Sequence, residues 1–336
     1  MTSSRAPVRA IIAGCGGYLP ERVLDNDALA AAYGLDTSDA WIVERTGIRQ
    51  RHIAAPGETA SQMGAEAARA ALKQAGASAD EVDLVVVATS TPDSAFPATA
   101  VRVQQHLGIT RGFGFDVAAA CTGFVYALGI ADSLIRTGQA RSALVIGTEV
   151  FSRIMDWTDR GTCVLFGDGA GAVLLRAGTG DGLPSDRGII STHLHSDGRH
   201  GDILLVDGGA GSNGEAGKLR MAGKEVFRHA VSKLASVVDE ALAANGLRHE
   251  DVRWLVPHQA NLRIIEAMGR KLKLPPERVV VTVDRHANTS AASIPLALAE
   301  AAAGMERGEG RIAPGDLVVL EGIGGGLTWG AALVRF

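Results

Sequence analysis

The chain is poor in cysteine and in aromatic residues, and it carries little net charge. Its 336 residues include three cysteines, Cys15, Cys121 and Cys163, which lie far apart and form no C-x-x-C pair or other zinc-binding spacing. This cysteine usage fits a reducing cytoplasm best. The net charge of −4 gives no sign of a nucleic acid or a membrane surface as a partner.

Long hydrophobic runs are also missing from the sequence. No stretch reaches the roughly 18 uninterrupted apolar residues of a membrane span, and residues 1–8 lack the apolar segment of a secretory signal. We therefore expect a cytoplasmic protein. What the sequence does contain is abundant Ala, Gly and Val, with 46% apolar residues, which predicts close-packed helices on buried sheets.

Two pairs of similar segments indicate an internal duplication. Residues 72–86 match residues 242–256 without a gap, and each segment reads as an amphipathic helix closed by Gly, a polar turn and an apolar strand. Residues 170–176 match residues 329–335, which predicts one equivalent strand near the end of each half. The chain therefore looks like a duplicated α/β unit.

The duplication predicts the architecture. A length above the roughly 250–300 residues at which a single core stops growing favours two units, and we place them at residues 1–180 and 181–336. Apolar strands alternate with helices, so each half is expected to be an α/β unit whose sheet is buried on both faces. Two such halves would stack as five layers, αβαβα, with the helices at residues 60–75 and 226–244 shared at the centre. The expected strands include residues 84–87, 143–146, 279–283 and 317–320.

Cys121 is the first candidate for chemistry. It follows an alternating strand at residues 113–117 and begins a helix that Gly138 ends. Unsatisfied N–H groups and the positive end of the helix dipole favour thiolate there, so we expect a thiol pKa below the usual value of about 8.5. Taken alone, a cysteine among alanines is more often a small core residue.

Three loops in the second half also follow apolar strands. His258 comes directly after one such strand, Asn288 follows residues 279–283, and three glycines at 324–326 follow residues 317–320. Open α/β sheets place their sites at the carboxyl ends of strands. Each loop also has a structural interpretation: a core histidine, a helix-capping asparagine or a tight turn.

Four short motifs occur in register along the chain: AAACTGF at 118–124, VPHQAN at 256–261, NTSAAS at 288–293 and GGG at 324–326. WIVERTGIR at 41–49 and DRGT at 159–162 accompany them. Together they resemble the thiolase-like condensing enzymes, and specifically the β-ketoacyl-acyl-carrier-protein (ACP) synthase III family, over nearly the whole chain. Elongating synthases carry a second His where this chain has Asn288, so the Cys-His-Asn set points to the initiating class.

The resemblance implies a five-layered thiolase-like fold and the decarboxylative Claisen condensation that starts type II fatty-acid synthesis. Cys121 would attack a short acyl-CoA, with acetyl-CoA as the expected primer, while the N–H groups of Cys121 and Gly325 hold the oxyanion. CoA would then leave, and malonyl-ACP would lose CO2 while His258 and Asn288 donate hydrogen bonds to its thioester oxygen. The carbanion would attack acyl-Cys121 to give β-ketoacyl-ACP. No cofactor is expected, because the CoA thioester is a substrate.

The resemblance also implies substrate contacts. Stacking and cation–π attraction to the CoA adenine are implied for Trp41 and Arg160. Phe96 would reach across a homodimer to cap the partner's acyl pocket, and Ile323 would shape that pocket where many relatives have Phe. The implied CoA-binding residues are Trp41, Arg45, Thr46, Arg160, Met221, Phe227 and Asn261.

A run of basic residues suggests a protein partner. The helix at residues 261–272 bears Arg263, Arg270 and Lys271, opposed only by Glu266. A solvated helix face is the usual explanation for such a run. The family, however, docks its acidic acyl carrier protein on this helix, and Arg228 is expected to join the patch.

Other signals are discounted. His193 and His195 look like metal ligands, but no third ligand of another type has a clear claim, so no metal is expected. Residues 167–172 fit a loose dinucleotide pattern but precede a strand instead of a helix, which argues against nicotinamide chemistry. Two alternatives remain: a specialised acyl transferase or condensing enzyme of the same fold, and a non-catalytic carrier-binding partner, against which the intact Cys-His-Asn set argues.

Overall fold

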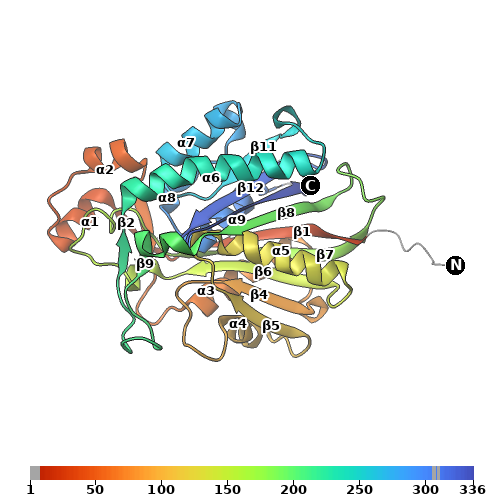
Figure 1. The fold of residues 1–336 in the computed structure, drawn as a ribbon. Helices are drawn as coiled ribbons and strands as arrows, with labels where there is room; N and C mark the ends of the chain where they lie inside the picture. Colours follow the sequence, from red (N-terminus) through yellow and green to blue (C-terminus); the bar gives the residue numbers. More distant parts are fainter. Residues whose placement is uncertain (1–7, 305–307, 309–310) are drawn as a thin grey trace.

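Two separate β-sheets, stacked with helices between and outside them, form the body of the molecule (Figure 1). The computed structural model describes residues 8–304, 308 and 311–336, so the expectation about a targeting segment at residues 1–7 lies outside the described residues. Within those described ranges, no helix is both long and apolar enough to cross a membrane.

The first sheet has five strands in the order β1-β7-β6-β4-β5. β4 pairs in parallel with β5 and β6, whereas β7 pairs antiparallel with both β6 and β1. All residues of β4 and β6 are buried, as the Val- and Ile-rich sequence predicts for central strands between two layers of helices. The bounds are β1 (Val8–Tyr18), β4 (Leu84–Ala88), β5 (Phe113–Val117), β6 (Ser142–Glu149) and β7 (Gly169–Thr179).

The second sheet repeats this arrangement with four strands in the order β11-β12-β13-β8. β11 and β12 are parallel, and β13 is antiparallel to both of its neighbours. Thus β11 and β13 hold the places of β4 and β7, as the sequence repeat predicts. Along the chain, the proposed division between residues 180 and 181 comes after the last strand of the first sheet, β7, and before the first strand of the second sheet, β8. The bounds are β8 (Gly188–Ser196), β11 (Trp254–Pro257), β12 (Leu317–Gly324) and β13 (Thr328–Arg335).

The central layer consists of α5 (Gly123–Arg136) and α9 (Ser293–Ala301). α5 and α9 each pack against strands of both sheets, and their apolar side chains join those strands in one core. Small residues permit this close packing: a Cβ at Gly171 on β7 would lie 2.5 Å from the backbone nitrogen of Leu296 on α9.

The prediction for the central helices is therefore wrong. α3 (Ala60–Gln74) and α4 (Thr99–Leu107) cover the outer face of the first sheet, and α6 (Gly223–Ala244) and α7 (Leu262–Lys271) cover the second (Figure 1). α3 and α6 carry charged residues on one face, which must stay in water, whereas α5 and α9 are apolar on nearly all sides. Only helices of the second kind can lie between two sheets.

The predicted strand at residues 279–283 is also wrong. Val279 makes an isolated bridge to Leu255, and the chain then turns into α8 (Val283–His286). The Gln259 side chain explains the difference, because it donates to one carbonyl and accepts from two N–H groups in this segment, at 2.8–3.1 Å. These backbone groups are then unavailable to a neighbouring strand.

Smaller elements surround one end of the sheets. The helix that carries Trp41 is capped by Ser38, whose Oγ accepts from the Trp41 N–H. Two short antiparallel pairs complete the fold. The bounds are β2 (Arg22–Asp25), α1 (Asn26–Tyr33), α2 (Asp39–Thr46), β3 (Gln50–Ile53), β9 (Leu204–Val206) and β10 (Leu219–Met221).

Candidate active site

A cavity of about 720 Å³ lies at the ends of both sheets and brings the three predicted reactive residues together. Cys121 reaches it from the turn after β5, His258 from the loop after β11, and Asn288 from the turn after α8. Gly325, which follows β12, lines the same space. Residues from both halves of the duplication thus form one site.

Cys121 lies in a 3-10 turn that leads directly into α5, so the predicted place at a helix N-terminus is confirmed. The glycines after β12 pack against this turn: a Cβ at Gly324 would lie 2.6 Å from the backbone nitrogen of Cys121. A side chain there would cover the N–H group that is expected to hold the oxyanion. The glycine run is therefore explained by close packing at the nucleophile.

The predicted lowering of the Cys121 pKa is wrong. The side chain is 6% exposed, and burial raises the pKa of the thiol to about 12, because a thiolate would lose its solvation. The negative charge of nearby Glu149 raises the pKa further, whereas a hydrogen bond from Ser290 lowers it. Burial outweighs the favourable end of the helix.

His258 is held as a neutral imidazole. It is 4% exposed, and burial lowers its pKa to about 3. Its Nδ1 lies 2.6 Å from Ser293 Oγ, which accepts a hydrogen bond from the Gln259 N–H. The Ser293 proton is then directed to Nδ1, which leaves the hydrogen on Nε2 and makes Nε2 the donor.

Asn288 is oriented by its own loop. Its Oδ1 accepts from the Ser290 N–H at 2.9 Å, and its Nδ2 lies 3.5 Å from the Ala260 carbonyl oxygen. The amide NH2 therefore lies on the same side as the loop that carries His258. The arrangement supplies two neutral donors beside one thiol.

Sequence reasoning missed a buried carboxylate behind Cys121. Glu149 ends β6 and is 0% exposed, and its carboxylate accepts from the Thr91 hydroxyl at 2.7 Å and from the Ser90 N–H. Burial raises the pKa of Glu149 to about 7. An acidic residue at the carboxyl end of an otherwise apolar strand was the available signal.

Of the residues predicted to bind CoA, four line the cavity, two lie beside it and one, Thr46, points elsewhere. Arg45, Met221, Phe227 and Asn261 line the cavity. Trp41 and Arg160 do not line it; the Arg45 guanidinium lies 4.5 Å from the centre of the Trp41 ring and that of Arg160 lies 5.1 Å from it. The two guanidinium groups and the indole thus form one cation–π cluster, of which Arg45 alone reaches the cavity.

Thr46 does not reach the cavity. Its side chain is 5% exposed, and its Oγ1 donates to the Ile42 carbonyl at 2.7 Å and accepts from the Ile48 N–H at 3.0 Å. The hydroxyl thus ends α2 instead of facing a ligand. The expected contact between Thr46 and CoA is not supported by this geometry.

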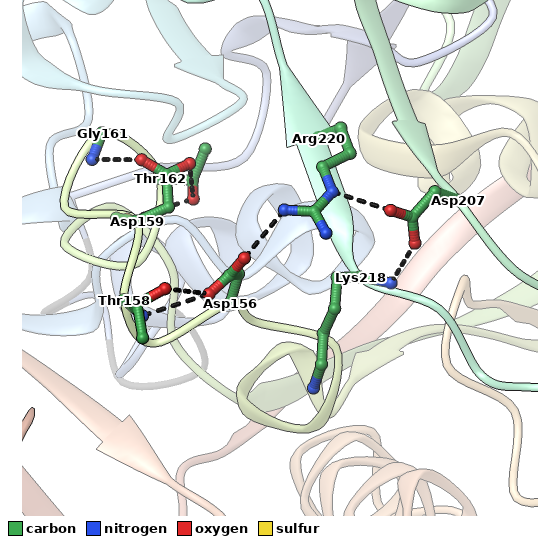
Figure 2. Close-up of polar contacts among 8 residues, drawn as sticks. All are labelled: Asp156, Thr158, Asp159, Gly161, Thr162, Asp207, Lys218 and Arg220. Atoms are coloured by element: carbon green, nitrogen blue, oxygen red, sulfur yellow. Dashed lines mark hydrogen bonds and ion pairs between the residues drawn. The ribbon is translucent and has the colours of Figure 1, made fainter.

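A polar network links β10 with the loop that carries Arg160 (Figure 2). Arg220 on β10 donates to Asp207 at 2.7 Å and to Asp156 at 2.8 Å. β9 and β10 supply lining residues, and Asp156 begins the loop that carries Arg160. The network in Figure 2 therefore positions the β9–β10 pair against that loop. Sequence reasoning also missed this role.

The two residues predicted for the acyl pocket lie in different surroundings. Ile323 is 5% exposed and lines the cavity. Phe96 is 85% exposed and does not line the cavity of its own chain. A contact of Phe96 with an acyl group would therefore require a second copy of the chain.

The predicted docking residues are exposed, but they differ in their distance from the cavity. Arg263 lines the cavity, and its guanidinium lies 5.4 Å from the centre of the Phe227 ring. Arg270 and Lys271 lie at the far end of α7, and Arg228 is exposed on the neighbouring α6.

The histidines considered as metal ligands have another partner. His193 Nδ1 lies 2.9 Å and His195 Nε2 lies 2.7 Å from the two carboxylate oxygens of Glu240 on α6. Among residues 8–304, 308 and 311–336, no group of three or more His, Cys, Asp or Glu side chains is placed to hold a metal ion.

Comparisons with known proteins place the chain in a family. The family model described as 3-oxoacyl-[acyl-carrier-protein (ACP)] synthase III matches residues 115–198, and the model of the C-terminal part of that synthase matches residues 242–336. The β-ketoacyl-[acyl-carrier-protein] synthase III of Acidiphilium cryptum is 67% identical over 328 residues, which cover 98% of this chain and 99% of that protein.

Solved structures agree with the sequence comparison. The 3-oxoacyl-(acyl carrier protein) synthase III of Pseudomonas aeruginosa has a TM-score of 0.87 at 47% identity, covering 99% of this chain and 98% of that chain. The priming β-ketosynthase of the R1128 polyketide biosynthetic pathway has a TM-score of 0.87 at 37% identity, with the same coverage. The fold and the site define a thiolase-like condensing enzyme. The chain belongs to the β-ketoacyl-[acyl-carrier-protein] synthase III family and is an acyltransferase.

Proposed function

We propose that this enzyme condenses a short acyl-CoA, preferably acetyl-CoA, with malonyl-ACP to give β-ketoacyl-ACP, CoA and CO2. This is the initiating step of type II fatty-acid synthesis. The observation that carries the proposal is the convergence of Cys121, His258 and Asn288 on one cavity. A thiol beside two neutral donors suits a condensation in which decarboxylation generates the carbanion.

In the first half-reaction, Cys121 attacks the thioester carbonyl of acyl-CoA and releases CoA. The backbone N–H groups of Cys121 and Gly325 stabilise the oxyanion, which is supported by the close packing of the glycine turn against Cys121. No cofactor takes part, because CoA arrives and leaves as part of the substrate.

In the second half-reaction, the carboxylate of malonyl-ACP leaves as CO2 and negative charge develops on the thioester oxygen. His258 Nε2 and the Asn288 amide donate to that oxygen. A neutral donor is required, because an imidazolium would stabilise the malonyl carboxylate as well as the transition state. The low pKa of His258, about 3, keeps the ring neutral at physiological pH.

We assign the pantetheine arm of CoA to the part of the cavity lined by Met221, Phe227 and Asn261. The adenine is assigned to the stack of Trp41, Arg45 and Arg160 outside it. A substrate in this position would displace the Arg160 guanidinium from the indole.

The acyl carrier protein is proposed to dock on α7. Arg263 at the mouth of the cavity, followed by Arg270 and Lys271 along the helix and Arg228 on α6, forms a basic surface that complements an acidic partner. Docking there would point a phosphopantetheine arm into the cavity. We place this reaction in the cytoplasm.

A homodimer is proposed for the acyl pocket. Phe96 and Phe113 are exposed, and Phe113 begins β5, the edge strand of the first sheet. A second copy that covers this edge would bring Phe96 to the partner's acyl group. A bulky cap of this kind limits the pocket to short primers.

Separate assays of the two half-reactions test the proposed roles. Cys121→Ala should form no acyl-enzyme yet retain slow malonyl-ACP decarboxylation, because both donors remain. His258→Ala and Asn288→Ala should each be acylated normally but condense about 10²- to 10³-fold more slowly. Condensation near the wild-type rate in either donor variant would contradict the assigned roles.

A second function is favoured by one observation. The priming β-ketosynthase of the R1128 polyketide pathway has the same fold at 37% identity, so a specialised condensation by the same acyl-Cys121 chemistry is the alternative. Normal acylation by CoA thioesters without consumption of malonyl-ACP would favour it over fatty-acid initiation.

A further inference from the structure

Thr328, the first residue of β13, bonds to both of the backbone turns that carry the proposed oxyanion donors. Its Oγ1 lies 3.0 Å from the carbonyl oxygen of Ala119, in the turn that contains Cys121, and 3.3 Å from the carbonyl oxygen of Gly325. Both carbonyls are within reach of the one hydroxyl hydrogen, which a three-centre bond shares between them. A single side chain therefore joins the nucleophile turn to the glycine turn.

A second threonine adds to this link. Thr122 follows Cys121 in the chain and is 0% exposed, and its hydroxyl donates to the Thr328 carbonyl at 2.9 Å. Its N–H donates to the Ala119 carbonyl at 3.1 Å and closes the turn around Cys121. Thr122 and Thr328 are 206 positions apart, so these bonds connect the two halves of the duplication at the nucleophile.

The glycine turn depends on such an external link. Three consecutive glycines have no side chains whose packing could fix the turn, and their backbone is unusually free to change conformation. Within the described part of the chain, the hydrogen bonds between residues 119–122 and 324–328 are all made by Thr328 and Thr122. The distance between the two turns is therefore set by these hydroxyls together with the close backbone packing at Gly324.

We propose that Thr328 is a positioning residue of the oxyanion site, whose hydroxyl fixes the N–H groups of Cys121 and Gly325 relative to each other. Oxyanion donors must lie about 2.7–3.1 Å from the oxygen that becomes charged, and a displacement of about 1 Å can cost about 10²-fold in rate. Thr328 does not line the cavity, so it acts through the backbone. The inference rests on the proposed acyl-Cys121 chemistry.

The donors for decarboxylation are held by other bonds. The His258 imidazole bonds to the Ser293 hydroxyl, and the Asn288 amide oxygen accepts from the Ser290 N–H. Loss of the Thr328 hydroxyl should therefore disturb the oxyanion site of acyl transfer and leave the two decarboxylation donors in place. A general loosening of the fold would not discriminate between these two sets of donors.

The test compares wild type with Thr328→Val, which keeps the β-branched shape and removes the hydroxyl. We expect Cys121 acylation by acetyl-CoA to be about 10- to 100-fold slower, because one donor is displaced but not removed. Alkylation of Cys121 by iodoacetamide needs no oxyanion site and should stay within about twofold of wild type. Malonyl-ACP decarboxylation, compared in a Cys121→Ala background, should also stay within about twofold.

Two results would overturn the proposal. One is acylation of Thr328→Val within about threefold of the wild-type rate. The other is an equal loss in acylation, alkylation and decarboxylation, because a general disturbance of the fold would then account for the effect.

Thr328→Ser tests whether the hydroxyl is the group that matters. Serine keeps the donor and loses the methyl group, so acylation should return to within about threefold of wild type. A serine variant as slow as the valine variant would contradict the proposal, since the methyl group would then be responsible.

Thr148→Val is the matched control. Thr148 on β6 is 0% exposed, and its hydroxyl donates to the Ala60 carbonyl on α3 at 2.8 Å, which also joins distant segments. This variant should be acylated at the wild-type rate, and a tenfold loss would show that any buried threonine hydroxyl has the same effect. If wild type forms no acyl-enzyme with any acyl-CoA, the proposed function fails; equal acylation of wild type and Thr328→Val contradicts this inference alone.

Discussion

Ser293→Ala should separate the two half-reactions, because Ser293 acts on His258 alone among the three reactive residues. The hydroxyl lies 2.6 Å from His258 Nδ1, and both residues are buried. Without it, Nδ1 loses its partner, and the hydrogen on Nε2 is no longer fixed. Leaving a buried acceptor unsatisfied costs about 1–3 kcal/mol, which corresponds to a rate loss of about 5- to 150-fold if the loss falls on the transition state.

The assay is malonyl-ACP decarboxylation and condensation, measured beside Cys121 acylation by acetyl-CoA. We expect the loss in the first and no change in the second. Ser133→Ala is the matched control, because its hydroxyl donates only to the Gly129 carbonyl within α5. Decarboxylation by Ser293→Ala within about twofold of wild type would refute the reasoning about the tautomer.

Three further predictions concern binding and stability. Arg220→Met should raise KM for acetyl-CoA about two- to tenfold with little change in kcat, because the two ion pairs that position β10 beside the cavity are lost. Arg248→Met removes one exposed ion pair, with Glu250, and should leave KM unchanged. Arg270→Glu should raise KM for malonyl-ACP alone, whereas Arg263→Glu should raise KM for both substrates because Arg263 lines the cavity; equal effects of Arg270→Glu on both would contradict carrier docking. Ala287→Gly should raise the free energy of unfolding by about 1 kcal/mol, because Ala287 has a φ of 58° and a ψ of −164° that glycine adopts without strain; a lower Tm in the variant would contradict this.

The meeting of Cys121, His258 and Asn288 could be predicted from the sequence because four motifs in register resemble one enzyme family. Each residue follows an apolar segment, and the internal repeat predicts that the two sheets are equivalent. The motif order then indicates which enzymes use such a set.

The contacts between distant segments could not be predicted. The link from Glu149 to Ser290 joins residues 141 positions apart, and it forms only because the first turn of the central helix layer meets the end of β6. The strand expected at residues 279–283 failed in the same way, because the Gln259 side chain binds that backbone. The thiol pKa depends on burial, which outweighs the local effect of the helix end.

The most direct test of the account is the intact mass of the purified protein after mixing with acetyl-CoA, followed by malonyl-ACP. We expect one acetyl adduct on wild type, no adduct on Cys121→Ala, and loss of the adduct with release of β-ketoacyl-ACP when malonyl-ACP is added. If acetyl-CoA gives no adduct, a series of longer and branched acyl-CoA primers separates a different primer from a different chemistry. An absence of adducts with the whole series would contradict the acyl-Cys121 intermediate and with it the proposed function.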